Sequence, residues 1–307
     1  MPVTARLPGW LRNLYDYDSH FLQLGPWTAH YLDEGEGDPV VMVHGNPAWS
    51  FMYRHLVEGL RDRFRVVVPD HIGCGLSDHP GPSEYPYTLE QRARDFRRLL
   101  DSLSLERPVS LVVHDWGGLI GFSYATRYPD RIARLVVLNS AAFHVPGGKQ
   151  LNPALLWCRS SRLAPFLIRR LNLFSWAATN WGCGMHRMPR LVRKAYRYPY
   201  RHPTDRWAIL RFIQDIPLYR EDPSHAEVSR IQAGLEKLRD KPMLLCWGER
   251  DPVFDRDFLL QWQRRFPSAF LQKFTNGGHY ILEDARETIV RLVREFLTAP
   301  LKHNDGS

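Results

Sequence analysis

The chain has 307 residues, enough for one large domain or for a core with an inserted subdomain. Its hydrophobic content of 44% and charged content of 24% are ordinary for a folded, soluble protein. No apolar run reaches the ~20 residues that span a bilayer, and Met1–Asn13 lacks the apolar core of a secretory signal, so we expect a cytoplasmic protein.

The four cysteines are scattered along the chain without the spacing of metal ligands; they are Cys74, Cys158, Cys183 and Cys246. In a reducing compartment such cysteines are buried thiols. We therefore expect neither a disulfide framework nor a zinc site.

The formal net charge of +8 is concentrated in one segment. Residues 149–220 contain fourteen Lys and Arg but only two acids, Asp205 and Asp215, which leaves a charge of about −4 for the rest of the chain. A basic segment on a mildly acidic body is typical of a surface that meets a membrane or an acidic partner. The same arginines could instead be the solvated faces of helices, and the composition leaves both interpretations open.

Short apolar runs alternate with helical patterns through most of the chain. We expect strands at Phe21–Leu24, Thr28–Asp33, Val40–Val43, Phe64–Val68, Pro108–Asp115, Ile132–Leu138, Met243–Trp247 and Phe270–Phe274. We expect helices at Phe51–Leu60, Leu89–Leu103, Leu119–Tyr128, Ala226–Leu238, Asp257–Phe266 and Arg286–Leu297. This alternation predicts an α/β fold with a mostly parallel sheet and helices on both faces.

The alternation stops after Ala142 and resumes near Ala226. Between them Trp, Tyr, Arg and Leu recur at helical spacing, interrupted by prolines, which predicts an inserted helical cap. We expect the core at 1–143 and 225–300, the cap at 144–224, and a disordered tail at 301–307. The stretch Leu155–Trp176 is apolar on one side, a pattern that suits packing over the core or contact with a membrane surface.

Residues 108–118, PVSLVVHDWGG, have the strand–turn–helix setting of a nucleophile elbow, where a side chain is exposed on a sharp turn between small neighbours. The residue at the apex is Asp115, where a serine is usual. A carboxylate attacks carbon directly and forms a covalent ester, so chemistry at this turn need not be ordinary ester hydrolysis. By itself, Asp115 could equally cap the following helix.

Three chemically active residues follow predicted strands in the order nucleophile, acid, histidine: Asp115, Asp251 and His279. This is the order found in α/β-hydrolases, and the carboxyl ends of parallel strands form the usual ligand site. His279 needs a carboxylate to fix its tautomer and to stabilise its cation. Asp251 is the best-placed acid, Asp255 is a weaker substitute, and Asp284 is more simply a solvated loop residue.

Asn46 and Trp116 are expected on either side of Asp115. In an elbow, the oxyanion hole is made by the backbone N–H after the nucleophile and by one from the loop after an earlier strand, here Trp116 and Asn46. Their side chains add an amide and an indole N–H, which are neutral donors able to hold a leaving anion. Alternatively, Asn46 is a turn residue before Pro47 and Trp116 is a buried aromatic.

These motifs resemble two groups of proteins. HGNP at 44–47, HDWGG at 114–118, GH at 278–279 and the acid Asp251 are similar to the haloalkane dehalogenase group of α/β-hydrolases. The segments 68–78, 138–143 and 211–218 resemble the β-lactone decarboxylases of long-chain olefin biosynthesis, with similarity from about Phe21 to Leu297. The second resemblance implies an Asp115 nucleophile that converts a cis-β-lactone, a cis-3-alkyl-4-alkyloxetan-2-one, into a cis-olefin and carbon dioxide. No cofactor and no metal are expected.

The resemblance also implies partners. The substrate is small and hydrophobic, with long alkyl chains, and cap residues Leu155, Phe166, Phe174 and Trp176 are candidates to line a slot for them. Association with the β-lactone synthetase and upstream enzymes of olefin biosynthesis is implied, and the basic cap could dock them or contact a membrane peripherally. No recognition motif indicates nucleic acid.

Three alternatives remain on the same fold. A haloalkane dehalogenase would share every catalytic residue named above. An epoxide hydrolase would use cap hydroxyls, for which Tyr196, Tyr198, Tyr200 and Tyr219 are candidates, although Asn46 stands where that group usually has an aromatic. A catalytically inactive binding or scaffold protein would typically have lost a member of the triad. For the lactone, attack by Asp115 at the carbonyl or at the ring carbon that bears oxygen is left open.

Overall fold

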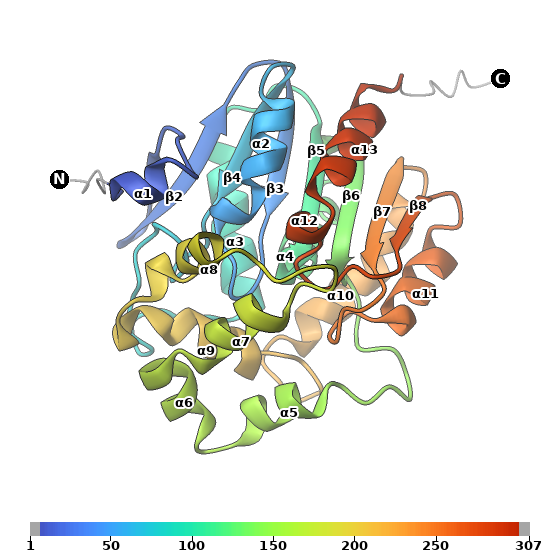
Figure 1. Ribbon diagram of the computed structural model, residues 1–307. Helices are drawn as coiled ribbons and strands as arrows, with labels where there is room; N and C mark the ends of the chain where they lie inside the picture. Colours follow the sequence, from blue (N-terminus) through green and yellow to red (C-terminus); the bar gives the residue numbers. More distant parts are fainter. Residues whose placement is uncertain (1–6, 301–307) are drawn as a thin grey trace.

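One eight-stranded sheet organises residues 7–300, which are the residues that the computed structural model describes (Figure 1). The tail expected to be disordered, 301–307, lies outside them. The strand order is β1-β2-β4-β3-β5-β6-β7-β8. β1 and β2 form an antiparallel hairpin, β2 pairs antiparallel with β4, and all other pairs are parallel. The strands are β1 His20–Leu24, β2 Trp27–Glu34, β3 Asp38–Val43, β4 Phe64–Pro69, β5 Val109–Asp115, β6 Ile132–Ser140, β7 Met243–Gly248 and β8 Phe270–Phe274.

Each expected strand is present within two residues of its expected bounds, and the predicted α/β class is confirmed. The strand β3 shows why the strands could be predicted from the sequence. Val40 and Met42 pack on one face of the sheet, whereas Val41 and Val43 pack on the other, and all four side chains are fully buried. A strand covered on both faces has no polar side, which explains its continuous apolar run.

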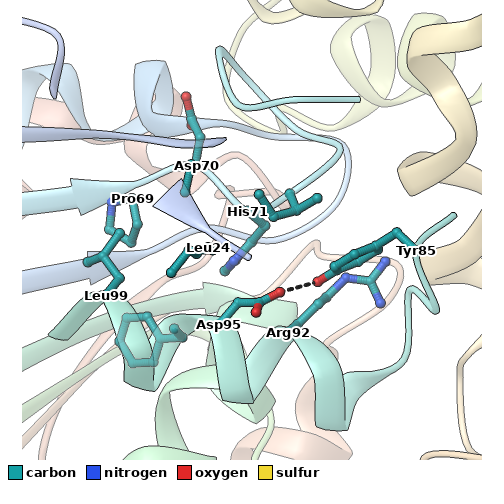
Figure 2. Close-up of a pocket in the computed structure, with 11 residues that line it drawn as sticks. Leu24, Pro69, Asp70, His71, Tyr85, Arg92, Asp95 and Leu99 are labelled. Atoms are coloured by element: carbon teal, nitrogen blue, oxygen red, sulfur yellow. Dashed lines mark hydrogen bonds between the residues drawn. The ribbon is translucent and has the colours of Figure 1, made fainter. Parts of the chain in front are cut away.

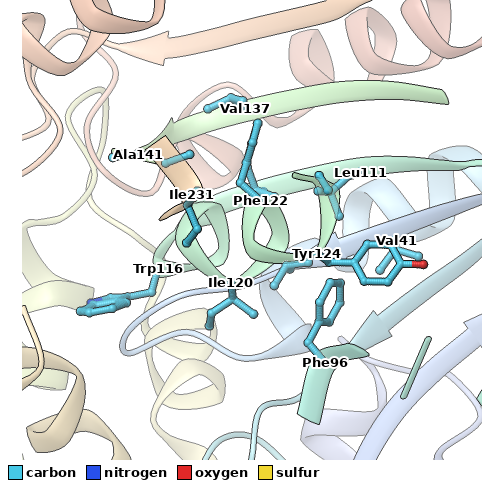
Figure 3. Packing of buried hydrophobic residues seen from close by; sticks show 14 of the residues in the cluster. Val41, Phe96, Leu111, Trp116, Ile120, Phe122, Tyr124, Val137, Ala141 and Ile231 are labelled. Atoms are coloured by element: carbon cyan, nitrogen blue, oxygen red, sulfur yellow. The ribbon is translucent and has the colours of Figure 1, made fainter. Parts of the chain in front are cut away.

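Helices cover both faces of the sheet. The helices α2 (Arg54–Leu60) and α13 (Arg286–Thr298) contribute apolar side chains to one cluster. The other face is covered by α3 (Leu89–Ser102), α4 (Trp116–Ala125), α10 (His225–Gly234) and α11 (Arg256–Arg265). Figure 3 shows this second cluster, in which Phe122 of α4 and Ile231 of α10 lie against strand residues such as Val137. Burying each such side chain contributes about 1.5–3 kcal/mol.

Several helix bounds differ from expectation. The helix expected at Phe51–Leu60 begins as a 3₁₀ turn, η1 (Ser50–Tyr53), before α2. α4 begins at Trp116, directly after Asp115, rather than at Leu119. The two glycines of this first turn pass so close to neighbouring backbone that a Cβ would overlap with it. The helix expected at Ala226–Leu238 ends as a 3₁₀ turn, η5 (Leu235–Leu238), after α10. The remaining elements are short and were not expected: α1 Gly9–Arg12, η2 Pro129–Arg131 and α12 Ile281–Asp284.

The segment between β6 and α10 is helical as expected, and its helices lie together beyond one end of the sheet (Figure 1). They are α5 Pro153–Ser160, α6 Ala164–Leu171, α7 Leu173–Trp181, α8 Arg190–Tyr196, η3 Tyr198–Tyr200, η4 Pro203–Arg206 and α9 Trp207–Gln214. The apolar stretch Leu155–Trp176 is divided among three short helices, with Asn172 in the left-handed region (φ 53°) between α6 and α7.

These helices have an apolar cluster of their own, formed by Ala164, Ile168, Tyr200, Ile209, Leu210 and Ile213. The division into a core at 1–143 and 225–300 and a cap at 144–224 stays a proposal, and the separate cluster supports it. Within residues 7–300, no helix combines the length and the apolar character needed to cross a membrane.

Candidate active site

Asp115 occupies a strained turn at the carboxyl end of β5. Its backbone has φ 53° and ψ −127°, a conformation that a non-glycine residue rarely adopts and that costs on the order of 1–3 kcal/mol. The turn is possible because its neighbours lack side chains. A Cβ on Gly117 would overlap with the carbonyl of Val43, and one on Gly118 would overlap with Ser140. The strand–turn–helix elbow expected from the sequence is therefore present.

The carboxylate of Asp115 is held by backbone donors. The backbone N–H of Asn46 donates to Oδ1 at 2.6 Å, and the nearby backbone N–H of Trp116 also favours the ionised carboxylate. The side chain makes no capping hydrogen bond to α4, so the alternative role as a helix cap is not what the geometry shows. Burial raises the pKa of Asp115 to about 6, although His279 and the two backbone donors oppose that rise.

His279 lies between two carboxylates. Its Nδ1 is 2.8 Å from Oδ2 of Asp251, and its Nε2 is 4.0 Å from Oδ2 of Asp115. Burial disfavours the charged imidazole, but the charge and hydrogen bond of Asp251, together with the charge of Asp115, outweigh it and raise the pKa of His279 to about 9. The structure thus brings the three predicted residues together at one site.

Asp251 is fixed from its other side by backbone. Its Oδ1 accepts hydrogen bonds from Val253 N at 2.8 Å and Phe254 N at 3.2 Å. Burial acts to raise the pKa of Asp251, but His279 and these two N–H groups lower it below its ordinary value. The carboxylate is therefore ionised and oriented, as a partner of an imidazolium requires.

The other two candidate acids have structural positions. Asp255 caps α11 through the N–H of Asp257 and pairs with Lys149. The expectation that Asp284 is a solvated loop residue is wrong. Its side chain is buried at the end of α12 and accepts hydrogen bonds from the backbone N–H of Gly184 and Gly278, both at 2.7 Å, and from Met185 at 2.9 Å. Asp284 therefore fixes the loop that carries His279.

Asn46 and Trp116 both lie at the cavity wall beside Asp115. The side-chain amide of Asn46 donates to the carbonyl of Ile209 at 3.2 Å, while its buried Oδ1 has no partner within residues 7–300. The indole of Trp116 packs on Phe212, with ring centroids 5.3 Å apart. Helix α9, which carries both Ile209 and Phe212, therefore positions the two expected donors.

Two further residues that the sequence analysis missed support His279. His114 Nε2 lies 2.8 Å from the carbonyl oxygen of His279, and burial lowers the pKa of His114 to about 3, so this ring is a neutral donor. Phe254 stacks on the imidazole of His279 at a centroid distance of 6.1 Å and an interplanar angle of 14°. The only sequence signal for either residue is its position: His114 directly precedes Asp115, and Phe254 follows Asp251 by three residues.

A cavity of about 560 Å³ opens over this site, within the range of small-molecule sites. Asp115, Asn46, Trp116 and His279 are among its few polar lining residues, and most of the others are apolar side chains of the core and cap. Of the four cap residues expected to line a slot for the alkyl chains, two do so. Leu155 and Phe174 line the cavity, but Phe166 and Trp176 do not and are exposed.

The four cap tyrosines proposed for an epoxide hydrolase lie elsewhere. None is among the residues that line the described cavity. Tyr196 is buried and donates to Glu283 at 2.7 Å, and Tyr200 is buried and donates to the carbonyl of Ala48 at 3.0 Å. Tyr219 is exposed. This geometry argues against epoxide activation by these hydroxyls.

A second, much smaller cavity of about 20 Å³ lies beside Asp70, which also follows a strand (Figure 2). Figure 2 shows Tyr85 donating to Asp95 there, at 2.7 Å. Asp70 itself accepts hydrogen bonds from Ser50 N at 2.7 Å and Leu76 N at 2.9 Å, and contacts His30 Nδ1 at 2.7 Å. Its role is to hold three segments of the core together. Within residues 7–300, no three His, Cys, Asp or Glu side chains form a group that could hold a metal ion.

Comparisons with known proteins agree with this geometry. A family model described as alpha/beta hydrolase fold matches residues 38–285. The cis-3-alkyl-4-alkyloxetan-2-one decarboxylase of Shewanella oneidensis is 48% identical, over 94% of this chain and 91% of that protein, and its namesake from Xanthomonas campestris is 42% identical, over 92% and 97%. Haloalkane dehalogenase 2 of Mycobacterium tuberculosis is 34% identical, over 92% and 96%. Among solved structures, haloalkane dehalogenase DatA from Agrobacterium tumefaciens matches with a TM-score of 0.82 at 25% identity, over 94% of this chain and 98% of its own.

Proposed function

This chain belongs to the alpha/beta hydrolase fold family, and within it we propose an enzyme that converts a cis-3-alkyl-4-alkyloxetan-2-one with long alkyl chains into a cis-olefin and carbon dioxide. The observation that carries the proposal is a carboxylate, Asp115, at the elbow, facing a largely apolar cavity of about 560 Å³. The two decarboxylases at 48% and 42% identity support this assignment over one based on the dehalogenases, which are 34% identical or less.

Asp115 serves as the nucleophile. Attack of its carboxylate at the ring carbon that bears oxygen forms an ester bond to Asp115 and breaks the ring carbon–oxygen bond, leaving a free carboxylate on the neighbouring carbon. The electrons of the bond to that carboxylate then form the double bond, carbon dioxide departs, and Asp115 leaves as a carboxylate. Attack at the carbonyl would instead give an anhydride, in which the carboxyl group is not free to depart. The ring-carbon route consumes no water, and inversion followed by anti departure preserves the cis arrangement.

His279 and Asp251 stabilise charge in this scheme. With a pKa of about 9, His279 is cationic at neutral pH and faces a carboxylate, first that of Asp115 and then that of the ring-opened intermediate. An imidazolium does not accept a proton from water, so hydrolysis of the ester has no general base. Asn46 and Trp116 supply N–H donors for the carboxylate that leaves the ring carbon.

A haloalkane dehalogenase is the second candidate, because the same five residues suit displacement of halide from an alkyl halide. In that reaction His279 would have to activate water against the ester.

One experiment separates the two functions. The purified protein is given a long-chain cis-β-lactone and, separately, a 1-bromoalkane of similar length. We expect an olefin from the first and no halide release from the second, whereas halide release with an untouched lactone would favour the dehalogenase.

Location and protein partners are part of the proposal. We place the enzyme in the cytoplasm, in association with the β-lactone synthetase and upstream enzymes that produce its substrate. This follows from the proposed reaction, since a lactone with two long alkyl arms is poorly soluble in water. Co-purification of the tagged chain with those enzymes would test the association.

A further inference from the structure

We propose that the outer face of helices α5–α7 is a docking surface for an anionic lipid bilayer, against which the mouth of the cavity opens. The proposal rests on the proposed function for its substrate and product, but it concerns a surface distant from the triad. Three independent features of residues 151–195 carry it: exposed apolar side chains, unbalanced positive charge, and continuity with the cavity.

The exposed apolar side chains are concentrated on this part of the chain. Among residues 7–300, all exposed large apolar side chains except Tyr219 and Phe270 belong to residues 157–191: Trp157, Leu163, Phe166, Leu171, Leu173, Trp176, Trp181, Met185 and Leu191. Folded proteins rarely leave such a group open to water without a binding role. Trp and Leu on short helices are typical of segments that lie at a lipid interface.

Helix α6 shows the pattern most clearly. It buries Ala164 and Ile168 in the apolar cluster of the cap. Its other side nevertheless exposes Phe166 and Leu171, and Leu163 directly precedes the helix; these side chains are 54%, 60% and 54% exposed. A helix that needs only to cover the core has one apolar face, whereas α6 has two.

The charged residues of this segment are basic, and of them Arg159 is paired with Asp222 from outside it. Residues 151–195 contain eight Lys and Arg and no Asp or Glu. Arg162 precedes α6 and Arg170 lies in its last turn; both are exposed and have no carboxylate within 4 Å among residues 7–300. Arg187 and Arg190 are also exposed. Each such group near an anionic leaflet contributes about 1 kcal/mol to binding in general, so charge attraction adds to the insertion of apolar side chains.

The same surface is continuous with the cavity over Asp115. Trp157, Leu173 and Trp181 line the cavity and are also exposed, so they stand where its wall meets the outside. The proposed product is an olefin with no polar group, which water cannot carry away. A mouth that opens against a bilayer lets the alkyl arms enter and leave through lipid, and this favours a lipid surface over an acidic protein as the occupant.

Vesicle flotation tests the proposal without substrate, so its outcome is separate from that of the decarboxylase assignment. The probes are vesicles of phosphatidylcholine alone and vesicles with added phosphatidylglycerol. We expect the protein to float with the anionic vesicles, and added salt to weaken that recovery. Replacing Leu163, Phe166 and Leu171 together by serine should lower the partition coefficient at least about tenfold. The pair Arg162→Glu and Arg170→Glu should remove the preference for anionic lipid.

Matched variants on other faces serve as controls. Phe270→Ser changes an equally exposed aromatic on β8, and Arg264→Glu with Arg291→Glu changes two exposed arginines of α11 and α13. Both should float like the wild type, and all variants should retain turnover of a short-chain, water-soluble lactone. The proposal is overturned if the protein stays with the unbound fraction, if the triple serine variant floats as well as the wild type, or if the surface proves to be occupied by a second copy of the chain in solution.

Discussion

The Nε2 atom of His279 lies 4.0 Å from Oδ2 of Asp115, too far for a hydrogen bond and close enough for strong charge attraction. The imidazole is instead hydrogen-bonded at Nδ1 to Asp251. Asp115 is thus free to attack a substrate, while the cation beside it favours its ionised form. In the proposed mechanism, this arrangement lets a buried carboxylate act as a nucleophile at neutral pH.

The pH dependence of turnover should have two limits. Asp115, with a pKa raised to about 6, must lose its proton to attack, so kcat/KM should fall about tenfold per pH unit below about 6. His279, with a pKa raised to about 9, must keep its proton, so kcat/KM should fall again above about 9. A pH profile of olefin formation measures both limits. A rise in activity from pH 6 to 8 that follows a histidine deprotonation would show that His279 acts as a neutral base.

Removing the charge of Asp251 should damage catalysis more than folding. Asp251→Asn loses the ionised partner of His279 and favours the wrong tautomer, so we expect kcat to fall on the order of a thousandfold. The matched control is Asp255→Asn, which removes the charge that pairs with Lys149 but keeps an oxygen that can cap α11, so its stability should change by about 1 kcal/mol or less. Steady-state rates and thermal unfolding of both variants test this, and equal activity losses would contradict the assignment.

A methyl group at residue 45 should displace the nucleophile. A Cβ on Gly45 would overlap with Oδ1 of Asp115, the atom that Asn46 N holds at 2.6 Å. Moving a reacting group by about 1 Å costs on the order of a hundredfold in rate. We therefore expect Gly45→Ala to lower kcat by about that factor while the protein still folds. Wild-type turnover by this variant would mean that the position of Asp115 is not critical.

A buried ion pair should matter for stability. Arg54 and Glu283 form two hydrogen bonds, at 2.6 and 2.8 Å, and Tyr196 also donates to Glu283. The Arg54 charge outweighs the effect of burial and lowers the pKa of Glu283. Glu283→Gln leaves Arg54 without its counter-ion and should lower the free energy of unfolding by about 3–5 kcal/mol. The double variant Arg54→Met with Glu283→Leu should recover much of this loss. A loss of less than about 1 kcal/mol in the free energy of unfolding of Glu283→Gln, measured with denaturant, would contradict this prediction.

Much of the fold and site follows from local sequence pattern. The alternation of short apolar runs, such as that of β3, with helical patterns was sufficient to predict the sheet, and the order Asp115, Asp251, His279 was sufficient to predict that these three distant residues meet. The sheet and the meeting of these residues can be predicted because each depends only on a strand and on the turn that follows it.

Other features depend on contacts between distant segments. Asp284 was expected in solvent, but it is buried because the loop at Gly184 folds back over α12. Phe174 lines the cavity whereas Trp176, two residues later, faces outward, since the break at Asn172 sets the orientation of α7. Neither the burial of a short helix nor the rotation of one after a break is encoded in a local pattern.

The central claim is that Asp115 converts a β-lactone into an olefin without hydrolysis. Its most direct test is product analysis after incubation of the purified protein with a synthetic cis-β-lactone that bears long alkyl arms, with Asp115→Asn as the control. We expect a cis-olefin and an equal amount of carbon dioxide from the wild type and only background from the variant. A β-hydroxy acid as the main product, or olefin formation retained by Asp115→Asn, would contradict it.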